Sequence, residues 1–385
     1  MPNDHFVPRH YLRRFAFHGS ELICAANVDP YEFLGKRGIG GQCCADEFYD
    51  KNDSLNKLLG ATESDLAPLL ITVTQNEDFN IQEINGLKFL GIALYLRTRK
   101  AVESAKVLPK FMAREVIESA VRLGKLPLPP EGEVTEDLFD FKHVAGVVMG
   151  SFIPCWIETL TLAAKLLKSE NGSWFVTSDN PVVVLNQYCV GADKLRSYVG
   201  FSRSGFQLLM PMSPRLCLFI YDDHVYKVGG RSQRLVEITE SDVEIVNSLQ
   251  VQGAERRLYF HDPDLETGVK NLVNSYAGLR VPLRSTLQTL PGRTSDEQLL
   301  HLKNQSVRLP NRWDFCGYRR HIKSKPGDRR DPAWTDLADR VMKDLEQNPS
   351  EEGLFRRMER LSGNPIRPRL DSYQQGMALG GVKNL

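Results

Sequence analysis

Histidines and arginines crowd the first eighteen residues of the chain. Three of its eight histidines lie there, His5, His10 and His18, alongside three arginines. The same segment carries five large apolar side chains that need burial: Phe6, Val7, Tyr11, Leu12 and Phe15. Burying them draws the neighbouring imidazole and guanidinium groups toward the interior, where each needs a polar partner. This pattern predicts a site. His5 is its candidate general acid/base, because imidazole titrates near neutral pH; the alternative is a core histidine that anchors the segment.

A second polar group stands between two strand-like runs, as Ser178-Asp179-Asn180-Pro181. Loops on a rigid sheet often present catalytic groups, which makes Asp179 a candidate catalytic residue. Ser178 and Asn180 are candidate substrate-binding residues. If the chain uses a divalent cation such as Mg²⁺ or Mn²⁺, Asp179 is its candidate ligand. The alternative is an Asx turn, in which Asp and Asn bond their own backbone and Pro181 fixes the chain direction.

Charged residues on two expected helices could complete this site. Arg97 and Arg99 end an apolar helix expected over 81–99. Residues two apart do not share a helix face, so at most one of them points inward. We expect Arg97 to bind phosphate oxygens together with Arg13, since guanidinium groups suit that geometry. Glu63, on a helix with apolar positions over 55–73, is a third candidate catalytic residue, with a solvated carboxylate as the alternative.

The stretch from 308 to 330 is basic and interleaved with aromatic rings. It holds eight lysines and arginines together with Trp313, Phe315 and Tyr318. Cations for phosphates and rings for base stacking are the composition of a contact with RNA or DNA. The alternatives are a solvated surface and an intramolecular segment lying across an acidic face. The candidate contact residues are Arg312, Trp313, Arg319, Arg320, Arg329 and Arg330.

The overall composition limits the class of protein. The chain has 385 residues, a net charge of +1, 42% hydrophobic residues and 25% charged residues, as soluble globular proteins do. Nucleic-acid affinity would therefore come from a local patch. Its seven cysteines show no CxxC spacing, which favours reduced thiols in the cytoplasm over a zinc site. The apolar stretches are too short or too interrupted to cross a membrane.

The order of the expected elements predicts an α+β fold, with a helical block packed on a mostly antiparallel sheet. We expect a long helix over 135–169, bent at Pro154, before the strand-rich part, and a further helix from Thr239. The expected organisation is a core domain over 1–280, a linker over 281–305, a basic segment with a helical hairpin over 306–370, and a disordered tail over 371–385. The hairpin is an expected surface for a protein partner or a second copy.

Several motifs resemble those of a bacterial family known only as domain of unknown function 4238. The resemblance spans about residues 4–260 and has one departure, Phe6 where the family usually has Tyr. It implies a shared fold and shared motifs but no established activity, and it adds Tyr49 as a candidate substrate-binding residue. The matching motifs are His5-Phe6-Val7-Pro8, Tyr11-Leu12, Arg13-x-Phe15, Glu47-Phe48-Tyr49, Glu63, Leu94 to Arg99, Ser178 to Pro181, Pro211 to Pro214, and Asn247.

These candidates favour an enzyme that handles a phosphate-bearing substrate, a nuclease or other phosphodiester hydrolase in a bacterial antiphage or toxin setting. No motif of a known nuclease class is present, and a metal-independent mechanism is equally open. The main alternative is a non-enzymatic sensor or interaction module in which the polar motifs are structural. A third is a hydrolase or transferase that acts on a nucleotide.

Overall fold

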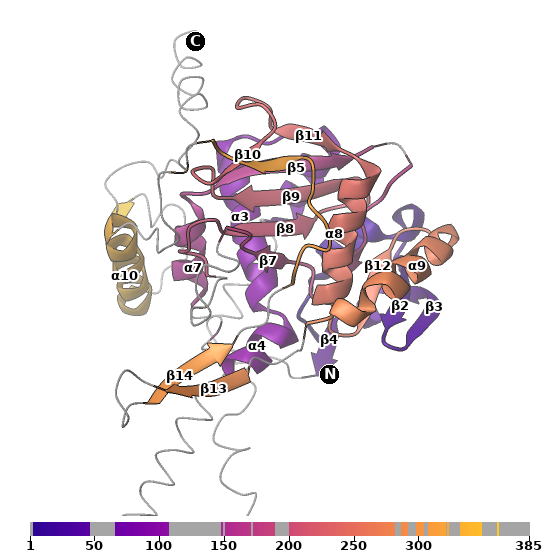
Figure 1. Ribbon diagram of the computed structural model, residues 1–385, viewed down its shortest axis with the longest axis horizontal. Helices are drawn as coiled ribbons and strands as arrows, with labels where there is room; N and C mark the ends of the chain where they lie inside the picture. Colours follow the sequence, from indigo (N-terminus) through magenta and orange to yellow (C-terminus); the bar gives the residue numbers. More distant parts are fainter. Residues whose placement is uncertain are drawn as a thin grey trace, which may run out of the picture.

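A five-stranded sheet forms the centre of the molecule (Figure 1). The computed structural model describes residues 3–46, 66–107, 148, 151–170, 172–188, 200–281, 286–291, 298–303, 307–320, 322, 332–348 and 360–361. The sheet is antiparallel except where its first two strands pair in parallel, which confirms the expected α+β class. Its strands, in spatial order, are β11 (Leu235–Ile238), β5 (Ala163–Ser169), β9 (Leu216–Tyr221), β8 (Gln207–Pro211) and β7 (Val183–Leu185).

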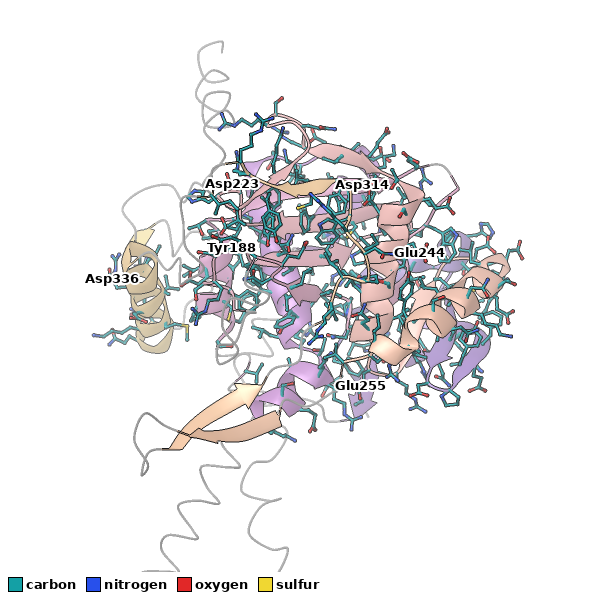
Figure 2. All side chains as sticks on the ribbon, viewed as in Figure 1. Tyr188, Asp223, Glu244, Glu255, Asp314 and Asp336 are labelled. Atoms are coloured by element: carbon teal, nitrogen blue, oxygen red, sulfur yellow. The ribbon has the colours of Figure 1, made fainter. Side chains whose placement is uncertain are left out.

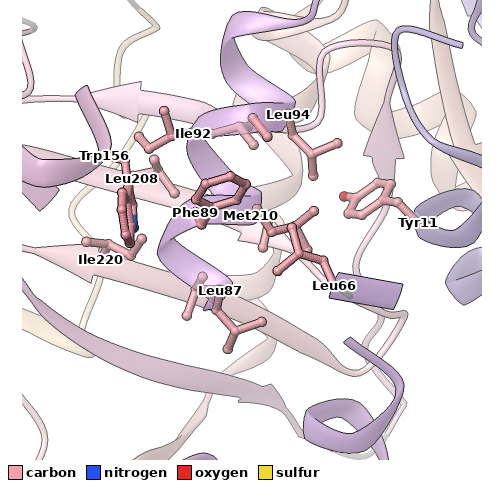
Figure 3. Close-up of a cluster of buried hydrophobic side chains, with 14 of the residues drawn as sticks. Tyr11, Leu66, Leu87, Phe89, Ile92, Leu94, Trp156, Leu208, Met210 and Ile220 are labelled. Carbon is pink, nitrogen blue, oxygen red and sulfur yellow. The ribbon is translucent and has the colours of Figure 1, made fainter. Parts of the chain in front are cut away.

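Helices cover both faces of this sheet, which explains why its middle strands are apolar at nearly every position. Leu208 and Met210 of β8 pack toward α3 (Ile81–Leu96), as Figure 3 shows. Leu209, between them, lies in the core shared with α8 (Glu240–Gly253) on the opposite face. The alternation of side chains along a strand therefore serves two cores at once.

The α3 helix begins and ends as capping rules predict. Asn80 accepts a hydrogen bond from the Glu83 amide, and the Glu83 carboxylate accepts one from the Asn80 amide in return. At the other end, Thr98 caps a separate helix, α4 (Arg99–Ala105), so the helix expected over 81–99 is divided near Arg97. The α8 helix begins after Thr239, as expected.

A second, four-stranded sheet packs beside the first. Its spatial order is β3 (Tyr31–Gly38), β2 (Leu22–Val28), β12 (Arg257–Phe260) and β6 (Thr177–Ser178). One face contacts α9 (Glu266–Tyr276). The other face contacts the N-terminal segment, which consists here of β1 (Asn3–His5), α1 (Arg9–Leu12) and the 3₁₀ turn Arg13–Phe15.

The N-terminal segment belongs to the core, as its apolar residues predict. Val7, Tyr11, Leu12 and Phe15 are fully buried, and Phe6 is partly buried against them. The Tyr11 hydroxyl donates to the carbonyl oxygen of Pro211 at 2.5 Å and lies 2.8 Å from Thr177 Oγ1. Because Pro211 and Thr177 belong to different sheets, Tyr11 joins the two sheets at their boundary.

The prediction of a single long helix over 135–169 is wrong at its C-terminal end. Helix α7 covers Phe152–Thr159, with Pro154 in its first turn rather than at a bend, and Ala163–Ser169 is strand β5. The buried ammonium of Lys88 donates to the carbonyl oxygens of Leu160 and Leu162. A side chain from α3 thus binds the carbonyls that follow α7, which the local sequence could not indicate.

Regular structure continues after residue 280. The stretch expected to be a linker contains a β-hairpin, β13 (Thr286–Pro291) with β14 (Gln298–Lys303). Residues 307–320, here called the crossing segment, pack on the core beside α8 and end in β15 (Cys316–Tyr318), which pairs with β10 (Tyr226–Val228). Helix α10 (Pro332–Gln347) buries Leu337, Ala338 and Val341 in the core beside α7.

Two further expectations concern parts of the chain that the structure describes incompletely. The second helix of the C-terminal hairpin and the tail over 371–385 lie outside the described residues, apart from Arg360 and Leu361. Among the described helices, none is both long and apolar enough to span a membrane. The six cysteines within the described part are all free thiols.

Candidate functional site

His5 lies at the end of β1, where it is held by backbone pairing and by two side-chain contacts. Strand β1 pairs with β4 (Cys44–Asp46), which places His5 opposite Cys44. His5 Nε2 is 3.2 Å from the carbonyl oxygen of Gly40 and 3.2 Å from Arg9 Nε. One nitrogen cannot donate to the carbonyl and accept from the guanidinium at the same time. The two contacts therefore belong to two proton arrangements of the same imidazole.

Arg97 approaches His5 from the end of α3. Its Nη2 donates to the His5 carbonyl oxygen at 2.8 Å, and its side chain is only 7% exposed. Arg99 points outward instead and pairs with Glu255 at 3.6 Å. The expectation that only one of these two arginines is directed inward, and that it is Arg97, is confirmed.

His10 is a titratable group of this region that the sequence analysis did not select. Burial, reinforced by the positive charges of Arg97 and Arg13, lowers the pKa of His10 to about 4. Its Nε2 is buried and has no hydrogen-bond partner among the residues that the structure describes. The ring is therefore neutral at physiological pH. The signal available in the sequence was its position between two arginines, Arg9 and Arg13, on adjoining helical turns.

Arg13, expected to hold phosphate oxygens, forms an ion pair with Glu21 instead. Its guanidinium donates to both carboxylate oxygens of Glu21, at 2.7 and 3.2 Å, and both side chains are largely exposed. The arginine whose guanidinium contacts the His5 ring is Arg9, which the sequence analysis did not select.

The residues Ser178–Pro181 connect the two sheets, because β6 belongs to one and β7 to the other. Asp179 is 7% exposed, and its carboxylate accepts from three consecutive backbone amides, Glu255, Arg256 and Arg257, at 2.8, 2.7 and 2.9 Å. Burial raises the pKa of Asp179 above its ordinary value, and these three amides oppose the rise. The carboxylate fixes the turn between α8 and β12.

Ser178 and Asn180, expected to bind substrate, are buried and bonded to α8. The Ser178 hydroxyl donates to Gln250 Oε1 at 2.9 Å. The Asn180 amide group donates to the carbonyl oxygen of Gly253 at 3.0 Å, and the Gln250 amide group returns a bond to the carbonyl oxygen of Pro181 at 3.0 Å. These contacts correspond to neither a substrate site nor a simple Asx turn, since they join the sheet boundary to a helix.

The surroundings of Asp179 do not fit a metal ligand. A carboxylate offers about four lone-pair positions, and the backbone amides occupy three of them. The cations Lys100 and Arg280 also act on it electrostatically. Burial lowers the pKa of Lys100 to about 8, Arg280 adds to that effect, and the carboxylates of Asp179 and Glu255 oppose it. In the described part of the chain, no group of three or more His, Cys, Asp or Glu side chains is arranged to hold a metal ion.

The α3–α4 junction links the two predicted motifs. Arg97 at its start contacts His5, and Lys100 three residues later lies within electrostatic range of Asp179. Glu255, whose backbone amide donates to Asp179, follows the end of α8 (Figure 2). The two motifs are therefore neighbours of the same junction, although each has its own set of partners.

The residues predicted to contact nucleic acid on the crossing segment include both buried and exposed side chains. Trp313 is 1% exposed and packs against Phe219 and Phe315, so no base can stack on it in this arrangement. Arg319 donates to the backbone carbonyl of Asp223 and lies 4.0 Å from its carboxylate. Arg312 and Arg320 are exposed. Tyr318, which the sequence analysis did not select as a contact, is 48% exposed.

Four of the predicted site residues lie outside the described residues: Tyr49, Glu63, Arg329 and Arg330. Comparison with curated proteins and with solved structures gave no match. A model of the family described as "Protein of unknown function (DUF4238)" matches residues 3–264, well over half of the chain. The chain therefore belongs to the DUF4238 family.

Proposed function

We propose that this protein is a hydrolase of phosphodiesters, of the nuclease type, with His5 as its general acid/base. The observation that carries the proposal is the convergence of two guanidinium groups on one histidine. Arg9 lies 3.2 Å from the His5 ring, and the buried Arg97 holds the His5 backbone at 2.8 Å. An imidazole that can exchange a proton beside fixed cations suits the chemistry of an anionic phosphodiester.

In this proposal each residue has a distinct role. His5 takes a proton from the attacking hydroxyl or water and returns one to the leaving oxygen. Arg9, which is exposed, binds a phosphate oxygen, and Arg97 keeps the His5 backbone in place. Asp179 does not touch the substrate in this scheme, because its oxygens are bonded to backbone amides.

The test is hydrolysis of single-stranded RNA, single-stranded DNA, duplex DNA and bis(p-nitrophenyl) phosphate by the purified full chain, with Mg²⁺, with Mn²⁺ and with chelator. We expect His5→Ala to reduce the rate about 10²–10⁴-fold, the usual contribution of a positioned acid/base. His224→Ala is the matched control, since His224 is exposed in the turn before β10. If no substrate is cleaved, or if the His5 and His224 variants are equally active, the proposal is wrong.

A second candidate function has its own supporting observation. The polar side chains of Ser178–Pro181 are buried and bonded within the fold, as a non-enzymatic sensor or interaction module would have them. Binding of RNA or DNA to the crossing segment without hydrolysis would favour this candidate over the hydrolase.

A further inference from the structure

Hydrogen bonds of Arg257 and Gln42, together with the backbone of the turn before Gln42, connect the environment of His5 to Asp179. Asp179 Oδ2 accepts from the backbone amide of Arg257 at 2.9 Å. The side chain of the same Arg257 donates, through Nη1, to Gln42 Oε1 at 3.0 Å. Gln42 is 6% exposed and immediately follows the 3₁₀ turn Ile39–Gly41.

Gln42 fixes the turn that carries the Gly40 carbonyl. Its side-chain amide donates to the carbonyl oxygen of Gly38, just before the turn, at 3.4 Å, and its backbone amide closes the turn by donating to the carbonyl oxygen of Ile39 at 3.0 Å. Gly40, inside the turn, directs its carbonyl oxygen to His5 Nε2 at 3.2 Å. A Cβ atom added to Gly40 would lie 3.8 Å from Arg9 Cζ, so the turn also packs beside the guanidinium that competes for that nitrogen.

Cys43, the residue after Gln42, hydrogen-bonds the turn to Phe6, the residue after His5. Cys43 has a φ of +51°, in the left-handed region that costs energy for a non-glycine residue. Its carbonyl accepts from the Phe6 amide at 3.0 Å, and its thiol donates to the Tyr259 hydroxyl at 3.3 Å. Such a conformation persists only where surrounding contacts hold it in place. Here two residues of β12 provide such contacts: Tyr259 bonds Cys43, and Arg257 bonds the preceding Gln42.

We propose that Asp179, Arg257 and Gln42 are positioning residues that hold the Gly40 carbonyl against His5 and thereby select which ring nitrogen carries the proton. With the carbonyl in place, neutral His5 keeps its proton on Nε2 and donates it to Gly40. When the carbonyl withdraws, Arg9 Nε donates to Nε2 and the proton moves to Nδ1. The inference deepens the proposed function and rests on it, since the ring nitrogen of His5 without a proton is the one that can take a proton from the attacking hydroxyl or water.

The experiment records the imidazole ¹⁵N signals of histidine-labelled full chain at alkaline pH, where exposed imidazoles are neutral. Loss of one signal set in His5→Gln identifies His5. We expect Gln42→Ala and Asp179→Asn each to shift the His5 signals toward the Nδ1–H form, and Arg9→Gln to shift them toward the Nε2–H form. Gln42→Glu keeps an acceptor for Arg257 and should restore the signals of the parent protein.

Gln252→Ala is the matched control. Gln252 is also a buried glutamine, and it makes two hydrogen bonds of 2.9 Å to the backbone of Arg308, away from the His5 turn. This variant should lower the melting temperature and leave the His5 signals unchanged. If Gln42→Ala and Asp179→Asn behave as Gln252→Ala does, the positioning role is overturned. The readout needs no activity, so absence of hydrolysis would refute the hydrolase alone, and unchanged His5 signals would refute the positioning role alone.

Discussion

His10 shows at the scale of one residue how burial changes the chemistry of a side chain. It is one position after the exposed Arg9, yet its Nε2 is buried and makes no hydrogen bond within the described part of the chain. A proton on that nitrogen would be a buried charge beside Arg97 and Arg13, and this explains why the pKa of His10 falls to about 4. His10 is therefore a neutral ring under conditions in which an ordinary histidine begins to titrate.

The lowered pKa of His10 predicts a loss of folding stability in mild acid. Between about pH 6.5 and pH 4 the unfolded chain takes up a proton on His10 that the folded chain does not, so stability falls as the pH falls through that interval. The lowered pKa of His10 corresponds to a loss of about 2–3 kcal/mol in the free energy of unfolding, and we expect this loss to be absent in His10→Gln. Urea unfolding at several pH values measures it. His224→Gln is the control, and an equal pH dependence in the parent and in His10→Gln would contradict the prediction.

At the scale of elements, the crossing segment is part of the core as well as a basic surface. Val307, Trp313 and Cys316 are buried beside α8, while Gln252 of α8 bonds the backbone of Arg308. Asp314 lies on this segment in Figure 2, and its amide donates to Asp242 of α8 at 2.8 Å. This arrangement agrees with the intramolecular alternative for the segment, on which Arg312, Arg320 and Tyr318 are exposed.

Two aromatic substitutions separate these roles. Trp313→Ala should destabilise the protein by about 3–5 kcal/mol, because it removes a fully buried ring from the core. Tyr318→Ala should weaken binding of single-stranded RNA or DNA by about 1–3 kcal/mol, as the loss of one stacking ring does, with a small change in melting temperature. Thermal melts and fluorescence anisotropy at low salt check both. Weak binding in the Trp313 variant with unchanged stability would reverse the assignment.

At the scale of the whole molecule, the segments beyond residue 280 complete the family core. The match to DUF4238 ends at residue 264, whereas the crossing segment covers the α8 side of the central sheet and α10 packs against α7 on the other side. Each face of the sheet therefore depends on a segment outside the family match.

Removal of residues 281–385 should therefore abolish cooperative unfolding. The truncation takes away Val307, Trp313, Leu337 and Val341, all buried. Each large apolar side chain stabilises by roughly 1.5–3 kcal/mol when buried, and a whole domain is stable by only about 5–15 kcal/mol. Circular dichroism during heating measures the transition, with removal of residues 371–385 alone as the control. A sharp melt of the 1–280 fragment at the parent temperature would show that the fragment is an independent domain.

The sequence by itself determined what depends on local pattern. The apolar run over 81–99 predicted α3, Thr239 predicted the start of α8, and the apolar side chains of the N-terminal segment predicted its burial. The spacing of Arg97 and Arg99 predicted that at most one of them points inward, but helix geometry did not decide which one. These features rest on contacts within a few residues of one another or on the plain need to remove apolar surface from water.

Only the tertiary structure decided where the polar groups find their partners. Whether Asp179 was a metal ligand or a structural carboxylate depended on three amides 76 to 78 residues later in the chain. The end of α7 depended on Lys88, 72 residues before Leu160, and the burial of Trp313 depended on Phe219. Residue types state which hydrogen bonds a side chain can make, but the partner is fixed when distant segments pack together.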